Sequence, residues 1–103
     1  MDTKQKDEFL ITQIILMFQA AALQQMGKLK NPMTDKVDRD LNQAQISIDI
    51  LDVLHRKMQG NLSNDEDKIF RQVLQELRLN YVDEAAKSQA EPVPPKTEPT
   101  PNA

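Results

Sequence analysis

The sequence contains no cysteine, no tryptophan, a single histidine and only two glycines among its 103 residues. Without cysteine, the chain has no disulfide, no thiol chemistry and no cysteine-based metal site. One histidine is too few for a typical zinc site, and two glycines are too few for a glycine-rich phosphate loop. The net charge of −3 lacks the basic excess that nucleic-acid binding requires. We therefore expect no cofactor, no metal and no nucleic-acid partner.

Proline is scarce until the C-terminal end of the chain, where five of the six prolines follow Lys87. Val93 is the only large apolar residue of this segment, which therefore cannot bury enough surface to offset the entropy of ordering. We predict a disordered, proline-rich tail at 87–103 and a flexible N-terminus at 1–6. The remaining residues, 7–86, are predicted to form one domain near the lower size limit for a stable core.

The two glycines mark predicted helix ends, because each follows a long stretch without proline. Gly27 and Gly60 can adopt the left-handed conformation that ends many helices. Ser63 and Glu66 have the S-x-x-E spacing of a capping box, which predicts that another helix begins soon after Gly60. The fold is predicted to be all-α, either a three-helix bundle or a helical hairpin with a third helix. The predicted helices span about 7–26, 38–59 and 64–86.

Two of these helices are more apolar than a small monomeric bundle requires. No charge occurs between Phe9 and Met26, and apolar residues project on almost every side of this helix. Apolar side chains cover more than half of the second helix, whereas the third has an ordinary narrow stripe. We predict a homodimer that buries this excess surface, with a tightly packed monomer as the alternative. The residues expected to form the core and the interface are Phe9, Ile14, Phe18, Ile48, Leu51, Leu54, Leu74 and Leu77.

The apolar first helix also has two other interpretations. Its uncharged stretch approaches the minimum length of a membrane span, but five polar residues interrupt it, four of them glutamines. Ala20-Ala21-Ala22 resembles a signal-peptide cleavage site, but the segment before it has no excess of positive charge. We therefore expect a cytoplasmic protein, and membrane anchoring through residues 9–26 is the alternative.

Two polar pairs are candidates for a specific role, and His55 projects near the middle of the apolar arc of the second helix. His55 follows Asp52 by three residues, a spacing that suits proton transfer or a small-ligand site. No nucleophile or second metal ligand accompanies this histidine, so we predict no enzymatic activity and keep a ligand site at His55 and Asp52 as an alternative. Asp49 and Arg78 flank the stripes of the second and third helices and form a candidate ion pair.

The run from Ile48 to Tyr81, IDILDVLHRKMQGNLSNDEDKIFRQVLQELRLNY, resembles the bacterial domain-of-unknown-function 1844 family. The resemblance extends over about 8–83 and is most specific at its K-x-x-G-N-L centre, although Met58 stands where the family usually has threonine. It implies a small helical bacterial protein and no activity. It also implies a role for Asn61, for which we expect a side-chain hydrogen bond that closes the turn. The matching positions are Ile48, Asp49, Leu51, Leu54, Lys57, Gly60, Asn61, Leu62, Glu66, Leu74, Leu77, Arg78 and Tyr81.

These features together predict a non-enzymatic interaction or scaffold module that associates with itself in the cytoplasm. A further protein partner is left open by the sequence.

Overall fold

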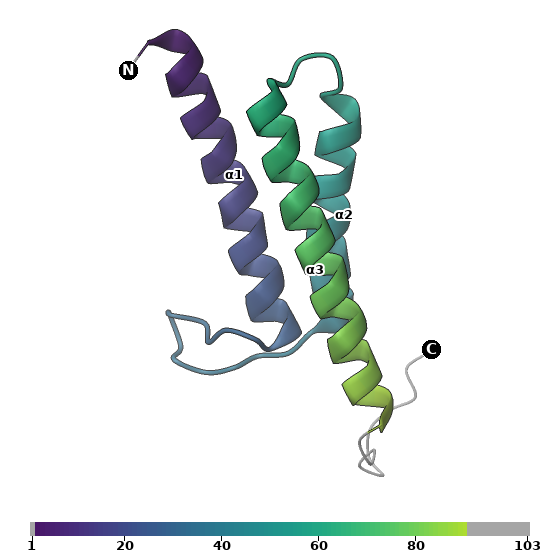
Figure 1. Ribbon diagram of the computed structural model, residues 1–103. Helices are drawn as coiled ribbons and strands as arrows, with labels where there is room; N and C mark the ends of the chain where they lie inside the picture. The colour runs from purple at the N-terminus through teal and green to yellow at the C-terminus, as the bar shows by residue number, and fades with distance from the viewer. Residues whose placement is uncertain (1, 91–103) are drawn as a thin grey trace.

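A computed structural model describes residues 2–90, with side chains through Lys87, as a bundle of three α-helices in which the second runs antiparallel to the other two (Figure 1). The helices are α1 (Thr3–Met26), α2 (Leu41–Lys57) and α3 (Asn64–Ala90), and the residues described contain no β-strand. Each helix packs against both of the others, and α3 extends past the bundle at the end where α1 stops. The predicted all-α fold with three helices is confirmed.

The core consists of one buried stripe on each helix. Four of the predicted residues, Ile48, Leu51, Leu74 and Leu77, belong to it, and Phe18 and Leu54 are partly buried against it. The spacing of three and four residues therefore identified the inward side of α2 and α3 correctly. The full set of buried apolar residues is Ile15, Ala22, Met26, Ala44, Ile48, Leu51, Phe70, Val73, Leu74 and Leu77.

The inward side of α1 differs from the prediction. Phe9 is 51% exposed and Ile14 is 43% exposed, whereas the fully buried residues of this helix are Ile15, Ala22 and Met26. A helix that is apolar on all sides has no stripe in its sequence to indicate which side faces inward. The packing of α2 and α3 decides the orientation of α1 instead.

The N-terminus is helical from Thr3, four residues before the predicted start of the helix and inside the segment 1–6 that was predicted to be flexible. Asp2 is the N-cap, and its carboxylate accepts a hydrogen bond from the Gln5 backbone N–H at 2.8 Å. The Gln5 side chain accepts one from the Asp2 backbone N–H at 3.1 Å. This capping box satisfies two backbone donors at the helix start, which explains why these residues join the helix.

Gly27 ends α1 in the left-handed conformation, with φ of 89°. Its N–H donates to the carbonyl of Gln24 at 3.0 Å, and the N–H of Lys28 donates to the carbonyl of Leu23 at 2.8 Å. This pair of bonds is the Schellman motif, which satisfies carbonyls that the helix leaves without partners. The predicted helix end at Gly27 is therefore present.

We expect Gly27→Ala to lower the free energy of unfolding by about 1–2 kcal/mol, because an L-residue is strained at this φ. A methyl group would meet the Arg39 side chain at 3.5 Å, an ordinary contact, so the effect comes from the backbone alone. Gly27→Asn should lose less, because asparagine tolerates this conformation better. Urea unfolding of the three proteins tests the ranking, and equal stability of Gly27→Ala and the unchanged chain would contradict it.

The corner between α2 and α3 is longer than the sequence suggested. The second helix was predicted at 38–59, but α2 begins after its N-cap, Asp40, and ends at Lys57. Gly60, with φ of 90°, therefore lies in the turn beyond the helix rather than directly at its end. The backbone N–H of Asn61 donates to the Met58 carbonyl at 2.9 Å and closes this turn. A backbone bond thus does what was expected of the Asn61 side chain.

The start of α3 carries the predicted capping box. The Ser63 backbone N–H donates to the Glu66 carboxylate at 2.8 Å, and the Glu66 N–H donates to Ser63 Oγ at 3.1 Å. At its other end α3 continues to Ala90, so residues 87–90 are helical although they were predicted to belong to the tail. The rest of the predicted tail, 91–103, lies outside the described residues.

Candidate interaction surface

Polar contacts between the helices show which side of α1 faces each neighbour. The Gln19 side chain donates to the Glu76 carboxylate of α3 at 3.3 Å. The side chains of Gln25 and Ser47 of α2 are hydrogen-bonded at 2.7 Å. Because successive residues turn by about 100°, α2 and α3 lie against two different sides of α1. The remaining side of α1 faces neither helix.

Six apolar side chains remain exposed on the side of α1 and α2 that turns away from α3. At about 100° per residue, Ile14 projects close to Gln25, and Leu10 and Met17 project further from α3. On α2, Ile50 projects on the outer side of Ser47. Their exposed fractions run from 37% for Ile50 to 67% for Met17. We call this surface the apolar face, and it consists of Leu10, Ile14, Met17, Ile46, Ile50 and Val53.

The apolar face contains few charges. No charged residue occurs in α1 after Glu8, so its entire share of the face is uncharged. On α2, the side chains of Ile46, Ile50 and Val53 line a shallow depression that Asp49 borders. A concentrated, uncharged apolar surface on a small domain typically marks an interaction site.

Some exposed apolar residues outside the apolar face are set among charges. Leu79 and Val82 of α3 are each 65% exposed, and both line a cleft with Arg71 and Arg78. Met33 is 91% exposed in the loop between α1 and α2. Isolated apolar side chains of this kind are normal on protein surfaces. Leu79 therefore serves below as a matched control for residues of the apolar face.

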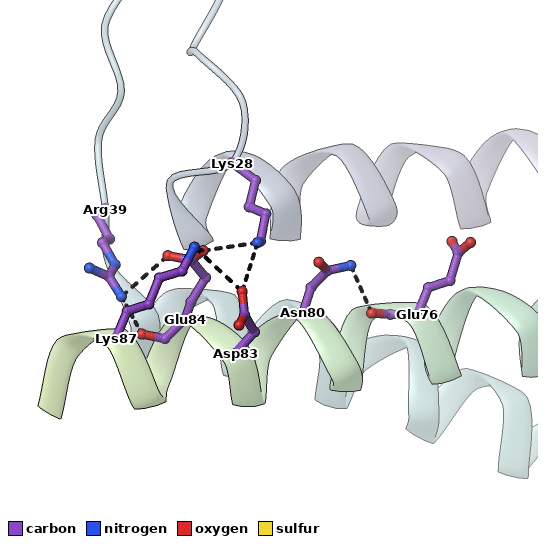
Figure 2. Close-up of polar contacts among 7 residues, drawn as sticks. All are labelled: Lys28, Arg39, Glu76, Asn80, Asp83, Glu84 and Lys87. Carbon is purple, nitrogen blue, oxygen red and sulfur yellow. Dashed lines mark hydrogen bonds and ion pairs between the residues drawn. The ribbon is translucent and has the colours of Figure 1, made fainter. Parts of the chain in front are cut away.

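A cluster of ion pairs joins the end of α1 and the start of α2 to α3 (Figure 2). Glu84, on α3, is only 8% exposed, and its carboxylate contacts Lys28 at 2.9 Å, Lys87 at 3.1 Å and Arg39 at 3.4 Å. Arg39 also donates to the Glu84 carbonyl. Asp83 lies 3.2 Å from the Lys28 amine. Because Lys28 follows α1 and Arg39 precedes α2, the cluster joins both ends of the long loop to α3.

The cluster shifts the pKa values of its members in the directions expected of ion pairs. The hydrogen bond from Lys28 holds the pKa of Glu84 below its ordinary value of 4.5. A hydrogen bond from the same amine lowers the pKa of Asp83. In return, Glu84 raises the pKa of Lys28 and of Lys87. Each of these groups is therefore held in its charged form.

We expect Glu84→Gln to destabilise the fold at neutral pH by about 1–2 kcal/mol, because it weakens the contacts of three cations. A carboxylate with a lowered pKa stabilises the fold above its unfolded-state pKa, and that stability is lost as the pH falls through the folded-state value. Stability of the unchanged chain should thus decline below about pH 4.5, and the decline should be shallower in Glu84→Gln. Urea midpoints from pH 7 to 3 test this, and parallel profiles for both proteins would contradict it.

His55 and Asp52 do not form the predicted pair. His55 Nε2 lies 2.7 Å from the Asp67 carboxylate of α3, and its ring packs on Phe70 with centroids 5.3 Å apart. This hydrogen bond lowers the pKa of Asp67. Both predicted residues line the cleft near Arg71, but each is already engaged by a protein partner. The pair expected from the sequence is therefore corrected to a contact that joins α2 to α3.

The predicted ion pair of Asp49 and Arg78 is also wrong. Arg78 contacts Asp52 at 2.8 Å, and Asp49 accepts a hydrogen bond from Gln45 within α2 at 2.9 Å. Asp52 lies one helical turn further along and projects towards α3, whereas Asp49 projects away from it. Hydrogen bonds from Arg56 and Arg78 hold the pKa of Asp52 below its ordinary value. Spacing along one helix did not reveal which carboxylate would meet the arginine.

An open cleft lies between the start of α1 and the corner of α2 and α3. It has a volume of about 710 Å³ and is lined by Lys4, Leu10, Met58, Asn61 and Ser63, among others. Asn61 thus borders this cleft, and within residues 2–90 its hydrogen bond to Met58 is made by the backbone N–H. In the part of the chain that the structure describes, no group of three acidic or histidine side chains is arranged to hold a metal.

One helix, Thr3–Met26, is long and apolar enough to cross a membrane when judged by length and composition alone. The same test is passed by buried helices of soluble proteins and by signal sequences. In the folded chain this helix packs on α2 and α3, and its glutamines Gln19 and Gln25 bond to both of them.

Comparison with known proteins agrees with the resemblance found in the sequence. The family model of a domain of unknown function (DUF1844) matches residues 8–83, which include most of all three helices. No curated protein and no solved structure matches the chain significantly.

Proposed function

The chain belongs to the domain of unknown function 1844 family, and we propose that it is a non-catalytic, cytoplasmic interaction module that forms a homodimer through the apolar face. The observation that carries this proposal is the exposure of six apolar side chains on one side of α1 and α2. A second copy presents the same uncharged surface, so the two faces are able to cover each other around a two-fold axis.

The small size of the domain supports the same proposal. Within residues 2–90 the core contains only ten buried apolar residues, a small number for a chain that has no cysteine to form disulfides. Oligomerisation is one way in which small domains add to a marginal core. Burial of Leu10, Met17 and Ile50 against a partner copy would remove large side chains from water at about 25 cal/mol per Å² of apolar surface.

A second candidate function is membrane association through α1, which its length and composition favour. Insertion would break the contacts of Gln19 with Glu76 and of Gln25 with Ser47. It would also pull Lys28 away from the buried carboxylate of Glu84. These losses are absent from dimerisation, which uses only surface that is already exposed, and we therefore place dimerisation first.

Light scattering of the full chain across a dilution series, without detergent, tests the proposed function. The monomer has a mass of 11.8 kDa, and a dimer at micromolar concentration should show twice that value. A folded monomer at all concentrations would overturn the proposal. Sedimentation of the protein with lipid vesicles, together with loss of the dimer, would favour the membrane candidate instead.

A further inference from the structure

We infer that the two copies dock around an axis parallel to the helices, so that α1 of each copy packs antiparallel on α2 of the other. This inference rests on the proposed homodimer and adds the arrangement of its helices. Three observations carry it: the positions of α1 and α2 residues along the bundle axis, the sizes of their outward side chains, and the absence of charge on α1 after Glu8.

The relative positions of α1 and α2 residues along the bundle axis follow from contacts at the two ends of this helix pair. At one end, Gln25 is hydrogen-bonded to Ser47. At the other, Leu10 and Met58 line the same cleft. Because both helices rise about 1.5 Å per residue in opposite directions, Met17 lies level with Val53 between these two ends. By the same count, Ala21 lies level with Ile50.

The outward side chains change size along each helix. On α1 the large residues Leu10, Ile14 and Met17 give way to the small residue Ala21 further along the helix. On α2, Ile50 lies level with this alanine and is 37% exposed. Ile46 lies one turn closer to the start of α2. At this position along the bundle axis, α1 therefore presents a small side chain and α2 presents a large one.

An axis parallel to the helices places equal heights opposite each other and brings α1 onto α2 of the partner. Ala21 of one copy then receives Ile50 of the other, and Met17 lies against Val53. The large Ile50 thus meets the small Ala21, as close packing requires. The α2 residues of the apolar face, Ile46, Ile50 and Val53, also pack against the part of α1 that carries no charge.

An axis perpendicular to the helices at the level of Met17 fits less well. With Met17 on that axis, α1 would pack on α1 and α2 on α2 of the partner, centred on Val53. Ile46 would then lie at the level of Gly60, where α2 has already ended, and would stay uncovered. The parallel axis covers Ile46 and therefore buries more of the apolar face than this perpendicular arrangement does.

Cysteine cross-linking tests the arrangement, because the chain has no cysteine of its own. Met17→Cys and Val53→Cys are prepared separately, shown by light scattering to remain dimeric, mixed to allow subunit exchange, and oxidised mildly. We expect a covalent heterodimer in the mixture at about tenfold the yield of cross-links in either variant alone, because disulfides require closely placed Cβ atoms. Met17→Cys mixed with Leu79→Cys, on the outer side of α3, is the control and should remain uncross-linked.

Efficient self-cross-linking of Met17→Cys, with none to Val53→Cys, would overturn the inference and indicate the perpendicular axis. Dimeric variants that do not cross-link in the mixture would also overturn it while leaving the proposed function intact. A monomeric unchanged chain would overturn both, so the two failures are distinguishable.

Discussion

Ile50→Glu is expected to yield a folded monomer at concentrations where the unchanged chain is a dimer. Ile50 is 37% exposed in the single chain, so a glutamate there can remain in water and leave the bundle intact. In the dimer, the two-fold axis would bury two carboxylates without partners, each at a cost of several kcal/mol. Dimerisation should weaken by at least about 100-fold. Sedimentation velocity over a concentration series measures this change.

Leu79→Glu is the matched control for that experiment. Leu79 is more exposed than Ile50, at 65%, and it lies on α3 away from the apolar face. The same substitution there should leave the association constant unchanged. Equal weakening by Leu79→Glu and Ile50→Glu would mean that added charge, rather than the apolar face, controls association.

The largest expected effect on folding is that of Leu51→Ala. Leu51 is fully buried between the helices, and its loss removes apolar contacts and leaves a cavity. The expected loss in the free energy of unfolding is about 2–5 kcal/mol, a large share of the stability of a small domain. Urea unfolding followed by circular dichroism, at one fixed protein concentration, measures it.

Leu79→Ala gives the same change of residue at an exposed helical site and should alter stability by less than about 0.5 kcal/mol. The difference between the two variants isolates the contribution of burial. A similar small effect of both substitutions would contradict the position of Leu51 in the core.

Much of the fold could be predicted because it depends on patterns within single helices. Ile48, Leu51, Leu74 and Leu77 recur at three and four residues on otherwise polar helices, and all four are buried. Ser63 and Glu66 form a local capping box, which needs no distant partner. The D-x-x-Q pattern at Asp2 and Gln5 is an equally local signal, and it would have extended α1 to Thr3.

The interhelical contacts could not be predicted in this way, because they depend on height and on rotation about the helix axis. His55 contacts Asp67, and Arg78 contacts Asp52. Both contacts join α2 to α3 and depend on how these two helices pack, which the pattern within one helix does not indicate. Glu84 was not singled out by the sequence, since its partners Lys28 and Arg39 follow and precede different helices. A buried carboxylate near the end of a long helix became recognisable only once the three helices were assembled.

The most direct test of the dimer is the dependence of the urea midpoint on protein concentration. If unfolding separates two chains that share a core across the apolar face, mass action requires the midpoint to rise with concentration. We expect a clear rise over a hundredfold range for the unchanged chain and for Leu79→Glu, and none for Ile50→Glu. A midpoint of the unchanged chain that is constant over this range would contradict the proposed dimer.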